Sequence, residues 1–434
     1  MKFTLSWLKD YLDTDASVDR LSEAMTALGL EVEGVEDPTA TLKNFIVADV
    51  LDCVDHPDSD HLHILKVATG TETIQVVCGA PNARTGLKGI LARPGVAMPD
   101  GMVIKKGKIR GVESQGMMCS FRELGLGEDH AGIVDLDSTA AAGTPVTEIL
   151  SLDSVFDISI TPNRADCLGV RGVARDLAAK GVGTFKDPAV APVKGAFKSP
   201  IGVRLDFPAA DAKACPLFVG RYIKGVKNVP SPQWLQDRLT AVGLRPISAL
   251  VDITNYLTIG RARPLHVFDA DKLSGDVVVR FAKDGETVLA LDGKSYTLDS
   301  GMVGICDAAG VQSIGGVMGG EPTGCGDATV NVFVESALFD PIAVARAGRA
   351  LQVDSDARYR FERGVDPASA IDGMEIATAL ILEICGGEAS ELVIAGAVPA
   401  APAEIAFRPS KVLAVGGLEV EPAEMVGILE RLGC

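Results

Sequence analysis

One histidine stands apart from the others in this sequence. His266 is the single histidine between residues 201 and 394, whereas the other four lie between residues 56 and 130. It follows Pro264, which favours an extended backbone just before it. An imidazole can exchange protons or hydrogen-bond near neutral pH, although an isolated histidine is more often structural.

A carboxylate within an apolar segment is the second candidate for chemistry. Glu335 lies in Val332-Phe-Val-Glu-Ser336, which has the composition of a strand. Because a buried carboxylate is costly without a partner, Glu335 either faces solvent or is paired. A charged segment at 354–367 is the third candidate. Spacing alone does not assemble these segments into one site.

Histidines 56, 61 and 63 leave two interpretations open. His61 and His63 would share one face of a strand, as metal ligands can. No cysteine or carboxylate completes an obvious ligand set at fixed spacing, although Asp58 and Asp60 lie close. The spacing favours the other interpretation, a polar loop that enters a strand, and no metal site is expected.

Two glycine-rich segments match nucleotide-binding motifs only in part. The segment from Gly101 to Lys108 is one residue too long for a phosphate loop, and Ile109 replaces the expected serine or threonine. The segment at 315–320 lacks the dinucleotide fingerprint. We interpret it as a tight turn that lets another group approach the backbone closely.

Basic residues gather in one stretch of an acidic chain. The formal net charge of −17 argues against a protein that coats nucleic acid with its whole surface. Residues 84–123 nevertheless hold eight Lys or Arg against three Asp or Glu, a local balance of +5. In a strand over 102–110, alternate residues share a face. Two interpretations of these basic residues stay open, contacts to phosphate and an ordinary solvated surface. The candidate phosphate contacts are Arg84, Lys88, Lys106, Lys108 and Arg110.

Length and composition predict a multidomain α+β protein. A chain of 434 residues is too long for one ordinary core, and its 5% of aromatic residues leaves the cores mainly to Val, Leu, Ile and Ala. No apolar run approaches the roughly 18 residues of a membrane span. The start acquires charge too early for a signal peptide. Nine scattered cysteines favour reduced thiols in the cytoplasm over disulfides or zinc.

The hydrophobic period predicts the order of elements. A short strand and two helices, Ser6–Tyr11 and Ser17–Gly29, open the chain, with Ser17 as N-cap. Helical character returns at Ala165–Lys180. Linkers are expected at 186–200 and 397–403, and residues 405–434 begin a strand and a helix. Five short strands predict a closed or nearly closed barrel of the oligonucleotide-binding (OB) type: Phe45–Val54, Ile64–Thr69, Thr73–Cys78, Lys88–Ala92 and Met102–Arg110.

Several dense motifs follow one another in a fixed order. They are Phe3-x-x-Ser-Trp-Leu8, His56–Val67, Cys78–Gly86, Gly111–Ser120, Phe156–Asp166, Arg245–Asn255, Pro264–Asp269 and Arg360–Pro367. No single motif is decisive, but together they resemble the beta subunit of bacterial phenylalanine–tRNA ligase over the whole chain.

The resemblance implies a division into domains. An OB-fold tRNA-binding domain, 40–149, would be inserted in a small split N-terminal α/β domain, 1–39 with 150–198. A mixed α+β editing domain would follow at 200–396. Residues 401–434 would begin a C-terminal helical or winged-helix-like domain, which makes the chain a truncated form of the family's longer chains.

The resemblance also implies partners and an activity. The family forms a cytoplasmic α₂β₂ enzyme in which the alpha subunit carries out aminoacylation with ATP and Mg²⁺. No ligand set for either cofactor is recognisable within residues 1–434. The beta subunit would contact tRNA(Phe) and hydrolyse tyrosine that is wrongly attached to it.

The site residues are carried over by position. His266 matches the family's editing histidine, Glu335 its tyrosine-selecting glutamate, and Ser355 a position of Thr or Ser. The stretch Leu351–Asp354 departs from the family's sequence, which weakens the assignment of Ser355. Substrate-binding positions would be Asn255, Gly315, Gly316, Gly319 and Ala357.

The implied chemistry fits these residue types. The hydroxyl of tyrosine would satisfy Glu335, whereas phenylalanine would leave it unpaired at a cost of ~1–3 kcal/mol. His266 is expected to position the ester or the attacking water, and glycine N–H groups to hold the oxyanion. Two other functions compete: a free-standing hydrolase that edits tRNA without a partner, and an inert tRNA-binding assembly module.

Overall fold

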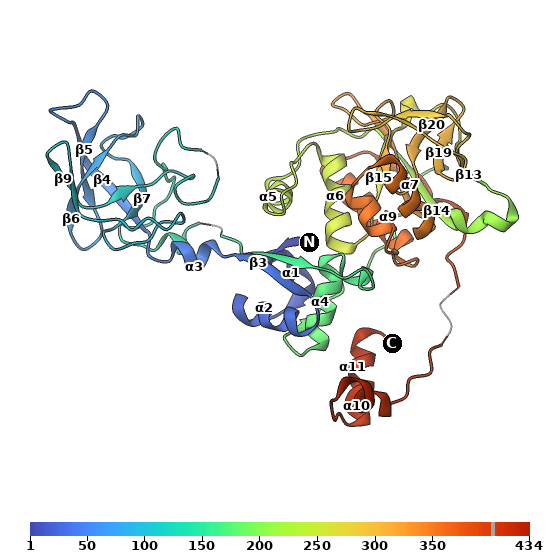
Figure 1. Ribbon diagram of the computed structural model, residues 1–434. Helices are drawn as coiled ribbons and strands as arrows, with labels where there is room; N and C mark the ends of the chain where they lie inside the picture. Colours follow the sequence, from blue (N-terminus) through green and yellow to red (C-terminus); the bar gives the residue numbers. More distant parts are fainter. Residues whose placement is uncertain (128, 151, 401–403) are drawn as a thin grey trace. The chain divides into compact units, whose positions relative to one another are not determined.

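The computed structural model describes residues 1–127, 129–150, 152–400 and 404–434. The chain divides into two compact units, Val35–Val155 and Met1–Gly34 with Phe156–Cys434 (Figure 1). Strands and helices occur in both units, which confirms the multidomain α+β organisation expected from the sequence. The finer domain boundaries stay predictions.

The smaller unit is built around a nearly closed five-stranded sheet with the order β10-β7-β4-β5-β6. Alternate residues of β5 and β6, such as Leu65, Val67 and Val76, point into one apolar core. The edge strand β6 is hydrogen-bonded to the residues just before β10: the Val77 N–H donates to Ser114 Oγ (3.1 Å) and the Gln115 N–H to the carbonyl of Gln75 (2.8 Å). The elements of this unit are α3 (Pro38–Leu42), β4 (Ile46–Asp55), β5 (His63–Ala68), β6 (Thr73–Cys78), β7 (Lys88–Ala92), β8 (Gly107–Ile109), β9 (Val112–Ser114), β10 (Met117–Met118) and a 3₁₀ turn at Val146–Glu148.

The fifth strand of the barrel does not lie where the sequence predicted it. The sheet is completed by β10, and the predicted strand Met102–Arg110 contributes only β8, which forms a separate hairpin with β9. The chain turns back at Arg110 and Gly111, whose φ angles of 45° and 85° lie in the left-handed region. The alternation of basic residues does not reveal this turn. The prediction that Lys106 and Arg110 share a strand face with Lys108 was therefore wrong, since both lie outside β8.

The larger unit begins with a small α/β domain whose sheet has the order β1-β11-β3. The Ser17 hydroxyl caps α2 by accepting a hydrogen bond from the Arg20 N–H (3.2 Å), and Gly29 follows the helix with φ 78°. The predicted helices Ser6–Tyr11 and Ser17–Gly29 are confirmed within one or two residues. The predicted helix Ala165–Lys180 ends as expected, but it begins as a 3₁₀ turn and becomes α-helical only at Val170. The elements are β1 (Lys2–Thr4), α1 (Leu5–Tyr11), β2 (Leu12–Asp13), α2 (Val18–Ala27), β3 (Glu31–Glu36), β11 (Val155–Ser159), a 3₁₀ turn at Ala165–Cys167, α4 (Val170–Ala179) and β12 (Thr184–Phe185).

Two five-stranded sheets face each other in the remainder of the larger unit. One has the order β13-β16-β19-β20-β21, and the other runs β15-β22-β14-β23, with β24 also pairing with β14. The strands are β13 (Val203–Asp206), β14 (Leu217–Lys224), β15 (His266–Asp269), β16 (Val277–Phe281), β17 (Thr287–Leu289), β18 (Ser295–Thr297), β19 (Val303–Asp307), β20 (Gly310–Ile314), β21 (Met318–Gly319), β22 (Asn331–Leu338), β23 (Glu388–Ala389) and β24 (Val393–Gly396). The helices are α5 (Gln233–Ala241), α6 (Ala249–Arg261), α7 (Pro341–Leu351), α8 (Asp356–Phe361), α9 (Ser369–Ile384) and 3₁₀ turns at Ala209–Ala214 and Ala270–Lys272.

Strand β22 separates two cores. Its residues Phe333 and Ala337 point towards the other sheet and join the core between the sheets. Its residues Val332 and Val334 point the opposite way, onto α6 and α9. This alternation follows from the period of two in a strand, and it assigns each β22 side chain to one side.

The predicted linker at 186–200 is held to the larger unit at several points. Its first residue, Lys186, donates its N–H to the carbonyl of Tyr11 (2.8 Å). Val193 donates its N–H to Glu375 (2.8 Å) and accepts a hydrogen bond from the buried Arg221. Further along, the Ala196 N–H donates to the carbonyl of Ala389 (2.9 Å). The segment is thus irregular in conformation but fixed in place.

The last described residues, 404–434, contain α10 (Ser410–Gly416) and α11 (Pro422–Leu432). The strand expected near residue 405 does not occur among them, so that prediction was wrong. Residues 401–403 of the second expected linker lie outside the described part of the chain. Among the described residues, no helix is long and apolar enough to cross a membrane.

The buried ion pair of Arg221 and Glu375 gives a prediction about stability. Their side chains are 2% and 8% exposed and approach to 2.7 Å. Glu375→Ala leaves a buried guanidinium without its counter-charge, which should lower the free energy of unfolding by about 3–5 kcal/mol. Urea denaturation followed by tryptophan fluorescence reports on this unit, because Trp7 and Trp234 both belong to it.

The matched control is Glu388→Ala on the same sheet. Glu388 pairs with Lys224 at 2.9 Å, but both side chains are about half exposed. An exposed pair contributes at most about 1 kcal/mol. Equal losses for the two variants would contradict the assignment of a buried electrostatic role to Glu375.

Candidate functional site

His266 and Glu335 are brought together by the pairing of two strands. In the antiparallel register of β15 and β22, these two residues lie directly opposite each other. Side chains at such positions project from the same face of the sheet, roughly 5 Å apart at Cβ. Their neighbours Phe268 and Phe333 belong to the core between the two sheets, which places the pair on that side.

The pair carries two buried polar atoms without partners. His266 Nε2 and Glu335 Oε2 are inaccessible and have no hydrogen-bond partner among the described residues. The imidazole instead packs edge-on against the ring of Phe268, with ring centroids 4.4 Å apart. Since buried polar groups are nearly always hydrogen-bonded, two such atoms on one face indicate a place where a polar ligand group is received.

Burial makes both groups neutral at pH 7. Removal from water disfavours the charged forms, lowering the pKa of His266 to about 4 and raising the pKa of Glu335 to about 8. Glu335 is thus a protonated carboxyl group that can both donate and accept a hydrogen bond.

Of the three glycines expected to line a pocket, one adjoins His266. A Cβ atom on Gly319 would lie 2.2 Å from His266 Cε1, so only glycine permits this approach between the sheets. The corresponding atoms on Gly315 and Gly316 would instead meet core side chains, both including Phe339, at 2.9 Å. The Gly315 N–H donates to the carbonyl of Val303 (2.9 Å), which removes it from the candidates for an oxyanion donor.

Ser355 is engaged in holding local structure. Its hydroxyl donates to the carbonyl of Val317 (2.6 Å) and accepts from the Arg358 N–H (3.1 Å) at the start of α8. It therefore ties α8 to the glycine-rich turn. Ala357, on α8, packs against the same core as the turn.

Asn255 is not brought to the His266–Glu335 pair. It lies on α6, whose buried residues Leu250, Ile253 and Leu257 pack on the opposite face of the sheet. A motif in the sequence reveals that a segment is present, but not which side of a sheet its helix covers. The position of Asn255 on α6 therefore does not support direct contact with a group bound beside His266.

The basic residues expected to bind tRNA fall into two groups. Arg84 and Lys88 are paired within the barrel, with Asp135 (2.6 Å) and Asp49 (2.8 Å). Arg110 donates to the carbonyl of Asp58 (2.8 Å). Lys106 and Lys108 have no ion pair with any residue that the structure describes. These two are the more available for phosphate.

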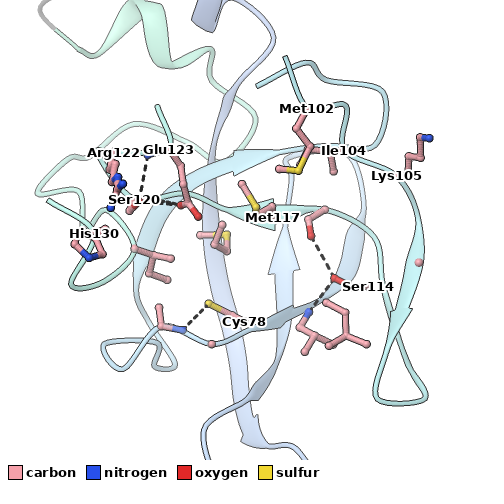
Figure 2. Close-up of a pocket in the computed structure, with 18 of the residues that line it drawn as sticks. Cys78, Met102, Ile104, Lys105, Ser114, Met117, Ser120, Arg122, Glu123 and His130 are labelled. Atoms are coloured by element: carbon pink, nitrogen blue, oxygen red, sulfur yellow. Dashed lines mark hydrogen bonds between the residues drawn. The ribbon is translucent and has the colours of Figure 1, made fainter. Parts of the chain in front are cut away.

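A large cavity in the smaller unit is lined by Lys105 and Lys108, but not by Lys106 (Figure 2). Its volume is about 1180 Å³, and both apolar and charged side chains line it, among them Met102, Ile104, Met117, Lys105 and Arg122. The analysis of the sequence missed its apolar lining, because residues 102–110 were interpreted as a regular strand. The unusual composition of that segment, apolar residues next to lysines, was the available signal.

Possible metal ligands occur together at one place among the described residues. Asp166, Cys167 and Asp176 lie within reach of a common ion. Arg164 and Arg175 donate hydrogen bonds to these carboxylates, so the charge that would attract Mg²⁺ is already compensated. The cluster is better explained as an ion-pair network. His61 and His63 make separate contacts, with Asp60 (2.8 Å) and Asp55 (3.3 Å).

Comparisons with known proteins match two segments of the chain to family models and the whole chain to curated relatives. The model of the B3/4 domain matches residues 214–386, and that of the putative tRNA binding domain matches residues 45–145. The beta subunit of phenylalanine–tRNA ligase from Rhodospirillum rubrum is 60% identical over 436 residues, covering all of this chain and 54% of the relative. That from Paramagnetospirillum magneticum is 59% identical with the same coverage.

Over its whole length, the chain is similar to phenylalanine–tRNA ligase beta subunits. It spans about half the length of these curated relatives. An N-terminal fragment of the phenylalanyl-tRNA synthetase beta subunit from Pyrococcus horikoshii is a more distant match. It shows 17% identity and a TM-score of 0.32, covering 64% of this chain and 77% of the fragment.

The residues of the two candidate sites lie within the ranges matched by two different family models. His266, Glu335, Gly319 and Ser355 all lie within the B3/4 match. The cavity and its lysines lie within the match to the putative tRNA binding domain. Each site is therefore assessed by itself.

The shifted pKa values predict how stability depends on pH. Between about pH 6.5 and 8, folded Glu335 holds a proton that the unfolded chain has released, so unfolding becomes easier as the pH rises. The free energy of unfolding should fall by up to about 2 kcal/mol across this window, and Glu335→Gln should abolish this fall. Below pH 6.5 the buried neutral His266 acts in the opposite sense, because the unfolded imidazole takes up a proton first.

Urea denaturation at several pH values measures this effect. The slope of the free energy of unfolding against pH should differ between wild type and Glu335→Gln from pH 6.5 to 8. The two slopes should become equal only at low pH, where Glu335 is protonated in both the folded and the unfolded state. Identical slopes throughout would mean that Glu335 is ionised in the folded protein.

Proposed function

We propose that this chain is the tRNA-binding and editing part of a phenylalanine–tRNA ligase beta subunit, hydrolysing tyrosine wrongly attached to tRNA(Phe). The observation that carries the proposal is the His266–Glu335 pair, with its two unpartnered buried atoms inside a B3/4 domain. Tyrosine differs from phenylalanine by a single hydroxyl group, and a buried polar group in an apolar pocket can distinguish the two.

Glu335 supplies the test for tyrosine. A phenol both donates and accepts, so it can pair with a protonated carboxyl as well as with a carboxylate. Phenylalanine leaves the buried carboxyl group unpaired, at a cost of ~1–3 kcal/mol, which corresponds to roughly five- to a hundredfold selectivity. When no ligand is bound, a buried neutral carboxyl group also has a smaller desolvation penalty than a buried carboxylate would have.

His266 acts on the ester in this proposal. Its neutral imidazole presents a free nitrogen that can hydrogen-bond the attacking water or the terminal ribose. Water adds to the ester carbonyl, and the bond to the ribose oxygen breaks. One proton of the water goes to that ribose oxygen, and the other leaves with the carboxyl group of tyrosine. No carboxylate orients His266 within the described part of the chain, so positioning suits it better than general-base action.

The synthetic reaction belongs to a partner in this proposal. Aminoacylation with ATP and Mg²⁺ would be carried out by the alpha subunit of an α₂β₂ assembly in the cytoplasm. The cluster at Asp166, Cys167 and Asp176 does not fit Mg²⁺, because two arginines already occupy its carboxylates. No step of the editing reaction is assigned to a metal.

Deacylation of purified tyrosyl-tRNA(Phe) tests the proposal. His266→Ala should slow the reaction roughly ten- to a hundredfold by loss of positioning. Glu335→Ala should remove the preference for tyrosyl over phenylalanyl esters, whereas Glu335→Gln, which is neutral and still donates and accepts, should retain part of it. Glu388→Ala, a carboxylate change on the same sheet, is the control.

Two results would count against the assignment. A His266→Ala, Glu335→Ala double variant that deacylates as fast as wild type would show that the site is inert. A Glu335→Ala variant that still prefers tyrosyl esters would remove its role in selection.

Gly319→Ala probes the close approach of β21 to the imidazole. The added methyl group would overlap His266 Cε1, so the ring must move and hydrolysis should fall about tenfold or more. The control is Gly326→Ala, since a Cβ there meets nothing within 4 Å. Equal activity of the two variants in the deacylation assay would show that the ring position is not critical.

A further inference from the structure

We propose that the cavity of the barrel receives one unpaired nucleobase of an RNA loop, with the flanking phosphates on Lys105, Lys108 and Arg122. This inference rests on the proposed tRNA binding and adds which part of an RNA the barrel holds and how. It concerns only the smaller unit and its own side chains.

Large apolar side chains are left uncovered in this cavity. Met102, Val103 and Ile109 line it and are 49%, 46% and 41% exposed. Apolar groups gathered in one hollow mark a binding site more often than scattered exposed residues do. A thioether and two branched side chains offer the flat face of a base a polarisable surface to pack on.

The charges of the cavity favour a phosphate-bearing ligand. Lys105, Lys108 and Arg122 have no ion pair with any described residue. The two carboxylates of the lining are occupied by local contacts: Asp100 accepts from the Met102 N–H (2.9 Å), and Glu123 from the Ser120 N–H (2.7 Å). Three cations against these two carboxylates leave the lining with a balance of +1, on a chain whose net charge is −17.

The hydrogen bonds of the polar groups in the lining indicate how a base would be recognised. Ser114 Oγ already accepts from the Val77 N–H (3.1 Å) and donates to the carbonyl of Gly116 (3.2 Å). Ser120 and Glu123 hydrogen-bond each other. With these groups engaged, binding depends on packing of the base rather than on reading its edge, and should tolerate any of the four bases.

The size of the cavity agrees with a nucleotide and its neighbours. At about 1180 Å³ it exceeds the roughly 300–1,000 Å³ of ordinary ligand pockets. A base inside a duplex cannot present its face to the cavity, whereas a loop base can leave the stack. The occupant is thus an unpaired base with its backbone on both sides.

Fluorescence anisotropy with the whole 434-residue chain tests the proposal. The probes are a labelled RNA strand of about 12 nucleotides, the same strand with its central base removed, and the strand paired with its complement. Wild type should bind the intact strand about tenfold more tightly than the abasic strand or the duplex. Exchanging the central base for another should change the affinity less than twofold.

Two sets of variants separate the contributions. Met102→Ala with Ile109→Ala should weaken binding of the intact strand about tenfold and leave the duplex unchanged. Lys105→Gln with Lys108→Gln should weaken all three probes and reduce the salt dependence by between one and two released ions. Leu51→Ala is the control, because Leu51 is 54% exposed on the same barrel but does not line the cavity.

The outcomes are distinct. Equal affinity for intact and abasic strands, or an unchanged affinity in the Met102→Ala, Ile109→Ala variant, overturns the base-binding assignment. Absence of RNA binding overturns it too and favours a protein partner for the apolar residues. Deacylation of tyrosyl-tRNA(Phe), measured separately, depends on His266 and Glu335, so failure of the editing proposal leaves a different signature from failure of this one.

Discussion

The register between β15 and β22 is the constraint on which the candidate editing site depends. It sets His266 opposite Glu335, and a slip of β15 by one residue along β22 would turn His266 onto the helices behind the sheet, away from Glu335. The register is fixed in turn by the apolar residues that alternate with them, because Phe333 and Val334 each have a core to fill on their own side. The chemistry of the site is therefore specified by residues that take no part in it.

Burial between the sheets has a second effect, which is to set the charge of both groups. A histidine and a glutamate on facing strands invite the interpretation of an ion pair. Because removal from water shifts the pKa of each group towards its neutral form, the pair is instead neutral at pH 7. An uncharged hydroxyl group can therefore bind beside the two side chains and leave again without the cost of separating charges. The barrel differs in this respect, since its cavity leaves lysine and arginine side chains in contact with solvent.

Local signals in the sequence predicted local structure well. Ser17 and Gly29 delimit a helix, and alternating apolar residues identify four of the five strands of the barrel sheet. The fifth was misplaced because a turn at Arg110 interrupts an alternating pattern, and no period in the sequence reports a left-handed backbone at a non-glycine residue. The meeting of His266 with Glu335 could not be derived from spacing, since only the pairing of strands distant in sequence creates it. The resemblance named both residues but did not indicate their protonation, which arises from packing around them.

The anchoring of the segment after Lys186 has a mechanical meaning. Lys186 is bonded to Tyr11 in the first domain of the larger unit, and Val193 to Glu375 and Arg221 in the two-sheet domain. Asp187, the next residue, pairs with Arg171 and Arg261, so only residues 188–192 lie between fixed points, a stretch that spans at most about 20 Å. The buried guanidinium of Arg221 holds both Val193 and Glu375, and so attaches the end of this stretch to the sheet. Releasing the segment requires breaking a buried ion pair, so its attachment is linked to the stability of the sheet that carries the candidate site.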